Sequence, residues 1–229
     1  MKKRKIPAMM AVLTAAGFVL RRLVYMTAVD GKNLIVTGHP AVIALWALTA
    51  AALALAAFGG WNQKEEALSY KAWAPAFLGH GLLGVGAALA VLLNPLPMPG
   101  LLGLLWKILG MMSPVCLLLA GFQRMRGKVP FFGLYAMVCL FFAVQVVAHY
   151  QIWCSNPQFT DYAFALLASV MLALQCYQLS AFPVELGNRK VLVMTALAAV
   201  YLCGTEIAQS LYPYLYLGGA LFCLTNVTE

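Results

Sequence analysis

The chain has 229 residues, of which 63% are hydrophobic and 10% are charged, and its mean hydropathy is +0.86. Soluble domains carry about 45–50% apolar and about 25% charged residues, so this composition excludes an ordinary water-soluble domain. The net charge of +8 lies mainly in short basic clusters between apolar segments. That distribution is typical of loops at a membrane surface, so we expect the lipid bilayer as a partner and no nucleic acid.

Apolar segments follow one another along the chain, and most have the ~20 residues needed to cross a bilayer. We therefore predict an all-α membrane helix bundle of about eight transmembrane helices. Residues 1–229 would form a single transmembrane domain without a soluble domain. The last segment is shorter and contains Pro213 and Gly218, and if it is re-entrant the chain crosses seven times. The predicted spans are Ile6–Val29, Pro40–Gly60, Ala72–Leu93, Gly100–Gln123, Val129–Trp153, Phe159–Phe182, Lys190–Ala208 and Leu211–Thr225.

Basic residues occupy every second loop, and this alternation predicts the orientation of the bundle. Cytoplasmic loops of membrane proteins carry an excess of Lys and Arg. The loops on the side of the basic N-terminus hold Lys64, Lys71, Arg124, Arg126, Lys128, Arg189 and Lys190. The opposite loops hold only Lys32 among basic residues, beside the acids Asp30 and Asp161. We therefore expect a multi-pass protein of the cell membrane with its N-terminus inside.

Sequence motifs give no sign of a catalytic or metal centre. Residues 79–84 (GHGLLG) have the spacing of a dinucleotide-binding loop, but they lie inside an apolar segment without the required preceding strand. Gly81, Gly84 and Ala88 share one helical face, which instead predicts close helix packing. His80 is expected to find a hydrogen-bond partner within the bundle, and a proton-relay role is the alternative. The three histidines are scattered and the six cysteines form no CxxC pair, so we expect no metal and no cofactor.

Arg21, Lys107 and Glu206 lie deep within predicted spans, and a charge at the bilayer centre costs about 2.5–3.5 kcal/mol on the most lenient scales. At 1.5 Å per residue, Arg21 lies ~22 Å and Glu206 ~24 Å from the inner face, and Lys107 lies ~12 Å from the outer face. Arg21 follows Gly17 by four residues, and Lys107 follows Gly103 by four. Small residues mark faces that pack against other helices, so both cations are predicted to point into the bundle.

Other polar residues belong to the same outer half of the predicted bundle. Gln145 and His149 are four residues apart near the outer end of one span, which places them on one helical face. Arg22 is turned ~100° from Arg21 and can extend outward to the membrane surface. Tyrosines gather at this level and are explained by an interfacial aromatic belt. They are Tyr25, Tyr150, Tyr162, Tyr212, Tyr214 and Tyr216.

Two interpretations of these charges remain open. In the first, Arg21 or Lys107 pairs with Glu206 in a structural salt bridge. In the second, the charges line an outward-facing pocket for a small anionic or zwitterionic solute. The candidate ligand-binding residues are then Arg21, Arg22, Lys107, Gln145, His149 and Glu206, with Asp30 and Asp161 as supporting acids.

The hypothesis that follows is a small-solute transporter or a membrane-embedded substrate-binding subunit. Two alternatives stay open beside it. One is an intramembrane enzyme acting on lipid headgroups, since such a site needs only one acid and one base. The other is a non-catalytic sensor or assembly partner of another membrane protein. The absence of enzyme motifs makes catalysis the less favoured choice.

Overall fold

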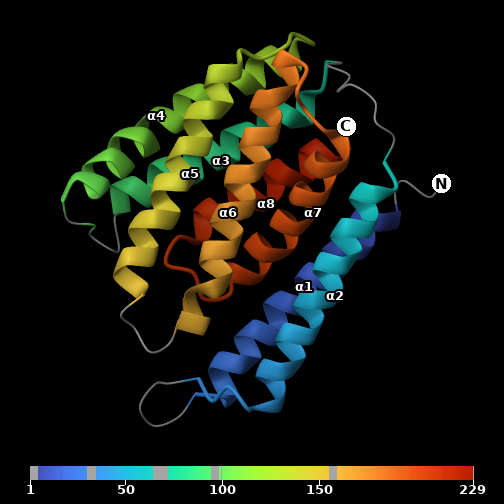
Figure 1. Cartoon of the computed structure of the whole chain (residues 1–229), viewed down its shortest axis with the longest axis vertical. Helices are drawn as coiled ribbons and strands as arrows, with labels where there is room; N and C mark the ends of the chain where they lie inside the picture. The colour runs from blue at the N-terminus through green and yellow to red at the C-terminus, as the bar shows by residue number, and fades with distance from the viewer. Residues whose placement is uncertain are drawn as a thin grey trace.

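The computed structural model describes residues 5–29, 35–63, 72–93, 98, 100–154 and 159–228. Over these residues the chain folds into eight α-helices and one short 3-10 turn, which confirms the all-α bundle (Figure 1). The helix bounds lie within a few residues of the predicted spans. They are α1 (Lys5–Thr27), α2 (Pro40–Trp61), α3 (Ala74–Leu93), α4 (Gly100–Met125), α5 (Phe132–Trp153), α6 (Phe159–Ala181), η2 (Phe182–Val184), α7 (Arg189–Glu206) and α8 (Pro213–Thr228).

Six of these helices, α1 to α6, are long and apolar enough to cross a membrane. The other two differ for identifiable reasons. Helix α7 carries Arg189, Lys190 and Glu206 within its 18 residues, and α8 begins at Pro213 and is only 16 residues long. The chain is therefore a multi-pass helical membrane protein with six helices that meet the length and apolarity expected of a span among its described residues.

Helix α7 lies in the interior of the bundle. It packs against α1, α2, α6 and α8, and most of its residues are buried. Figure 1 shows the hairpin of α1 and α2 flanking it, with α3, α4 and α5 on the far side of the bundle. Because protein covers α7 on several sides, polar residues on it face other helices instead of lipid. This position explains how Glu206 is accommodated at its end.

Glycines allow α8 to lie in close contact with α3, at positions outside the glycine face predicted from the sequence. A Cβ atom added at Gly86 would lie 2.6 Å from the carbonyl oxygen of Tyr214. One added at Gly218 would lie 2.5 Å from the carbonyl oxygen of Leu82. Small residues let helix backbones approach in this way within membranes. Of the predicted face, Gly84 does pack closely, against Pro114, whereas a Cβ at Gly81 would meet nothing closer than 3.9 Å.

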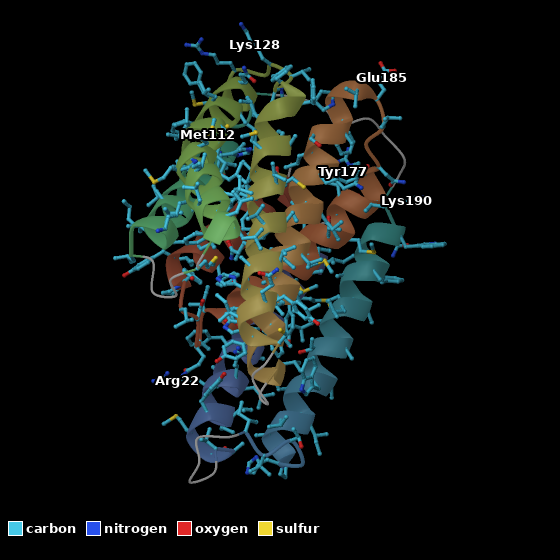
Figure 2. All side chains as sticks on the ribbon, turned by 60° about the vertical axis from the view of Figure 1, so that its left-hand side comes forward. Arg22, Met112, Lys128, Tyr177, Glu185 and Lys190 are labelled. Carbon is cyan, nitrogen blue, oxygen red and sulfur yellow. The ribbon has the colours of Figure 1, made fainter. Side chains whose placement is uncertain are left out.

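The bundle has two ends with different polar side chains. One end holds the last residues of α1, α5 and α7, and we call it the Glu206 end. The opposite end holds the last turn of α4, and we call it the Arg124 end. Figure 2 shows Arg22 toward the Glu206 end and Lys128 and Glu185 toward the Arg124 end.

Candidate functional site

A buried ion pair joins α1 to α7 at the Glu206 end. Nη2 of Arg21 lies 2.7 Å from Oε2 of Glu206, and the two residues are only 3% and 4% exposed. The guanidinium group also lies 4.5 Å from the ring centroid of Phe164, a distance at which cation–π attraction contributes. The predicted pairing of Arg21 with Glu206 is confirmed.

Small residues on α1 and α7 bring the two charges together. A Cβ atom at Gly17 would lie 2.5 Å from Oγ1 of Thr205, so only glycine permits this approach of the helices. Gly204 in turn faces the side chain of Thr14. Because Gly17 precedes Arg21 by about one turn, the close approach points the arginine at the end of α7. The inward orientation predicted for Arg21 therefore follows from its glycine neighbour.

A cavity of about 220 Å³ lies directly beside the ion pair. Glu206 is the one charged side chain among the described residues of its lining. Arg21 lines a different and much smaller cavity of about 20 Å³, together with Val24 and Phe164. The ion pair thus presents its negative end to the larger cavity. The residues that line the larger cavity are Tyr25, Trp153, Tyr162, Ala165, Glu206, Gln209, Ser210, Leu211, Tyr212 and Tyr216.

Aromatic stacking holds one wall of this cavity in place. The rings of Trp153 and Tyr162 stack with their centroids 4.4 Å apart and their planes 10° apart, which ties the end of α5 to the start of α6. On its other side Trp153 stacks on His149, with centroids 4.6 Å apart and planes 13° apart. Such stacks contribute beyond the area they bury, so these side chains have little freedom to fill the cavity.

Hydrogen bonds hold two further tyrosines of the lining, Tyr212 and Tyr216. The hydroxyl of Tyr212 lies 3.2 Å from Nε2 of His149. The hydroxyl of Tyr216 donates to the carbonyl oxygen of Ala165 at 3.2 Å and lies 3.3 Å from Oγ of Ser169. Both hydroxyls therefore already have protein partners. What these residues offer to a cavity occupant is mainly their aromatic rings.

Two predicted site residues, Gln145 and His149, contact the side chains around the cavity without lining it. Gln145 is buried, and its Nε2 donates to Oγ of Ser169 at 3.3 Å, next to Tyr216. His149 is 1% exposed and holds Tyr212 and Trp153. Neither residue is part of the cavity lining formed by the described residues. Both side chains face into the bundle, and their partners are neutral side chains.

Arg22 lies at the rim of the cavity. Its side chain is exposed, and its Nη1 donates to Oε1 of Gln209, which lines the cavity, at 3.3 Å. In Figure 2 this side chain points away from the bundle. The outward orientation predicted for Arg22 places a positive charge beside the entrance.

The predicted inward orientation of Lys107 is wrong. Its side chain is exposed on the outer surface of α4. The buried face of this helix follows Gly103, Trp106 and Gly110. Because Lys107 directly follows Trp106, it is turned about 100° away from that face. Lys107 therefore does not meet Glu206.

Two predicted supporting acids cannot be placed at this site. Asp30 lies outside the described residues. Asp161 belongs to α6, but its side chain is not among those that the structure describes. Their part in the candidate site stays a prediction.

A second buried arginine lies at the opposite end of the bundle. The sequence placed Arg124 in a loop, but it occupies the last turn of α4 and is 2% exposed. Its Nη1 donates to Oδ1 of Asn226 on α8. Nearby, Nε2 of His80 lies 2.7 Å from the hydroxyl of Tyr135, which confirms the hydrogen-bonded histidine that was predicted. The prediction for Arg124 failed because a helix end and a loop are hard to separate by composition.

The aromatic walls were missed at the sequence level. The sequence predicts Tyr25, Tyr162, Tyr212 and Tyr216 in an interfacial belt, whereas these four residues line the cavity. Tyr150 and Tyr214 do lie on the outer surface, 52% and 55% exposed. The sequence held one indication that Tyr212 and Tyr216 act together: they are four residues apart, a spacing that places two side chains on one helical face.

The described residues contain no group of three or more His, Cys, Asp or Glu side chains that could hold a metal ion. Fold and composition define the chain as a multi-pass helical membrane protein with a buried ion pair beside an aromatic cavity. Comparisons of the chain with protein-family models, with curated proteins and with solved structures found no match.

Proposed function

We propose that this protein binds a small polar solute in the cavity at the Glu206 end, as a small-solute transporter or as a membrane-embedded substrate-binding subunit. The observation that carries this proposal is the cavity of about 220 Å³ with a buried carboxylate in its wall. Pockets for drug-sized ligands have volumes of about 300–1,000 Å³. The cavity is below that range, so a small solute is the class that fits.

The ion pair itself supports a binding role. Desolvating two charges is costly, and apolar replacement of a buried pair is often neutral or stabilising. Ionisable residues within membrane helices are therefore functional candidates by default. Here the pair of Arg21 and Glu206 borders a cavity, which gives the carboxylate access to a ligand.

The basic residues support an outward-facing cavity. Lys128, Arg126 and Arg189 belong to the loops or helix ends away from the Glu206 end. If these loops are cytoplasmic, as the excess of Lys and Arg predicts, the N-terminus is inside and the cavity opens to the outer side of the cell membrane.

Solute binding accounts for the geometry better than catalysis on lipid headgroups. The enzyme hypothesis uses His149 or Glu206 as acid or base. However, His149 is stacked on Trp153 and bonded to Tyr212, and it is not in the cavity lining formed by the described residues. Its contacts fit a residue that positions Tyr212.

A thermal-shift screen of the purified full-length chain tests this proposal. We expect at least one class of small amino acid, betaine, amine or carboxylate to raise the melting temperature. The Tyr162→Leu variant should lose this shift, because Tyr162 lines the cavity. The matched control is Tyr177→Leu, on the same helix but 57% exposed and distant from Arg22 in Figure 2.

The two variants distinguish solute binding in the cavity from the alternatives. A solute shift that disappears in Tyr162→Leu and persists in Tyr177→Leu supports binding in the cavity. The proposal is wrong if no solute in the screen raises the melting temperature, or if the shift survives in Tyr162→Leu. A partner protein that copurifies in mild detergent, together with no solute effect, would favour the assembly role instead.

A further inference from the structure

The charge distribution around the cavity distinguishes between classes of solute. Glu206 contributes a carboxylate to the cavity lining, whereas its partner Arg21 lies on the other side of the pair, against Phe164. The floor of the cavity therefore presents the negative end of an ion pair. A cationic group fits this floor, and an anion would meet the carboxylate first.

The aromatic lining favours the same group. Four tyrosines and one tryptophan line the cavity: Tyr25, Tyr162, Tyr212, Tyr216 and Trp153. Aromatic ring faces carry partial negative charge and attract ammonium groups, and cages of such rings recognise methylated ammonium ligands. The hydroxyls of Tyr212 and Tyr216 are already bonded to His149 and Ala165, so hydrogen bonding to a sugar-like solute is less favoured.

The protein already contains one example of a cation in these surroundings. The guanidinium group of Arg21 lies between the carboxylate of Glu206, the ring of Phe164 and, at 5.8 Å, the ring of Tyr25. Tyr25 and Glu206 belong to the cavity lining as well. An ammonium group in the cavity would thus meet the same kinds of partner that hold Arg21.

The rim carries the opposite charge. Arg22 is exposed and donates to Gln209, which lines the cavity. A purely cationic solute would pass this arginine unfavourably, whereas an anionic group beside it would be stabilised. The floor and the rim together require both signs of charge on one small molecule.

From these observations we infer that the solute is a small zwitterion whose methylated ammonium group lies in the aromatic cavity beside Glu206, with its anionic group toward Arg22. This inference rests on the proposed solute-binding function and assigns its ligand class. Glycine betaine carries both groups within a few atoms and is the probe of choice. The same chemistry occurs in phosphocholine headgroups, so a free solute and a lipid are the two sources to separate.

Three water-soluble probes test the charge requirement on the full-length protein in a maltoside detergent. Glycine betaine has both charges, choline has only the ammonium group, and tert-butylacetate has the shape of betaine with carbon in place of the ammonium nitrogen. We expect betaine to bind most tightly, choline more weakly, and tert-butylacetate at least about tenfold more weakly than betaine. The measurements are melting-temperature shifts and dissociation constants from calorimetric titration.

Variants assign the binding to particular residues. Tyr162→Leu should weaken betaine binding about tenfold, and Tyr177→Leu should leave it unchanged. Arg22→Gln should weaken betaine but not choline, because choline has no anionic group to meet the arginine. Since Glu206→Gln alone can destabilise the fold, the double variant Arg21→Met with Glu206→Gln serves as the test of the carboxylate, and it should fold and lose both ligands.

A lipid source is tested in nanodiscs of phosphatidylcholine and of phosphatidylglycerol. If the ligand is a headgroup, phosphatidylcholine stabilises the wild-type protein relative to phosphatidylglycerol and suppresses the betaine shift, and Tyr162→Leu removes both effects. If it is a free solute, betaine shifts the melting temperature equally in both lipids. Either result supports the ammonium assignment.

Contrary outcomes are equally distinct. If tert-butylacetate or neutral solutes bind as tightly as betaine, the ammonium assignment fails while solute binding in the cavity stands. If none of the probes binds, phosphatidylcholine has no effect, and other solutes bind in a manner that depends on Tyr162, the ligand class is wrong but the proposed function holds. If no solute or lipid has any effect, both fail.

Discussion

Arg21 and Arg124, the buried arginines among the described residues, have different partners, and the difference separates the proposed binding site from a structural contact. Arg21 pairs with the carboxylate of Glu206, which also faces a cavity of about 220 Å³. Arg124 donates to the neutral amide of Asn226 in a closely packed region. There, a Cβ atom added at Gly121 would lie only 2.9 Å from Cβ of His80.

The position of Arg124 in its helix explains why a neutral amide is a sufficient partner for this buried cation. Arg124 lies in the last turn of α4, where the partial negative charge of the helix C-terminus favours a cation. Arg21 lies within α1, farther from a helix end that could help it, and it has a full opposite charge as its partner. The contact of Arg124 with Asn226 fastens α4 to α8, while the pair of Arg21 and Glu206 leaves a carboxylate beside the cavity.

The largest expected effect comes from separating the charges at the Glu206 end. Glu206→Gln leaves Arg21 buried without its counter-charge, and we expect a loss of about 3–5 kcal/mol in the free energy of unfolding. The double variant Arg21→Met with Glu206→Gln should regain most of this loss, because no unpaired charge remains. Melting temperatures of the purified variants measure both effects.

The exposed carboxylate of Glu185 provides the matched control. Glu185→Gln should leave the melting temperature unchanged, since Glu185 is exposed at the Arg124 end. A double variant as unstable as Glu206→Gln alone would contradict the ion-pair account and indicate a further role of the carboxylate in the fold.

At the Arg124 end, Asn226→Leu should cost about 1–3 kcal/mol, the usual penalty when a buried polar group loses a partner. Solute binding should be unaffected, since Asn226 lies on the opposite end of the bundle from the cavity lining. Thermal melts with and without solute check both statements. If the variant loses solute binding while remaining folded, the two ends are coupled and the division between them is wrong.

A smaller effect is expected for Tyr135→Phe. The variant removes the hydroxyl that lies 2.7 Å from Nε2 of His80, and the net loss for one hydrogen bond is about 0.5–1.5 kcal/mol. Tyr177→Phe is the control, because Tyr177 is 57% exposed. Equal melting temperatures of the two variants would show that the His80 contact adds nothing to stability.

The smallest effect is expected for Lys107→Leu. This side chain is exposed on α4 and away from the cavity, so stability should change by no more than about 0.5 kcal/mol and solute binding should stay as in the wild type. Titration of the solute into the purified variant measures this. A clear loss of binding would show that Lys107 takes part in the site and would contradict its outward orientation.

Some of these features could be predicted from the sequence because single residues carry the signal. The cost of a charge in a membrane singled out Arg21 and Glu206, and Gly17 indicated the face on which Arg21 lies. The same reasoning failed for Lys107, although Gly103 precedes it at the same spacing. Large Trp106 occupies the buried face there, and a glycine four residues away does not reveal which of two neighbours faces inward.

The cavity could not be predicted, because its lining comes from five helices, α1, α5, α6, α7 and α8, and from the connection between α7 and α8. Trp153, Tyr162 and Tyr212 come from the end of α5, the start of α6 and the segment before α8. Each of them alone is explained by an interfacial aromatic belt. Only tertiary packing shows that their side chains surround one space beside Glu206.

The central claim is that a zwitterion occupies the cavity at the Glu206 end, and thiol protection in the purified protein tests it most directly. Ser210 lines the cavity and Ser180 lies at the far end of α6, and both are partly exposed. Ser210→Cys and Ser180→Cys are each made in a Cys154→Ser background, which removes an exposed native thiol. We predict that glycine betaine slows maleimide labelling at position 210 and leaves position 180 unchanged. Equal labelling rates at position 210 with and without betaine, in protein that remains folded, would contradict the account.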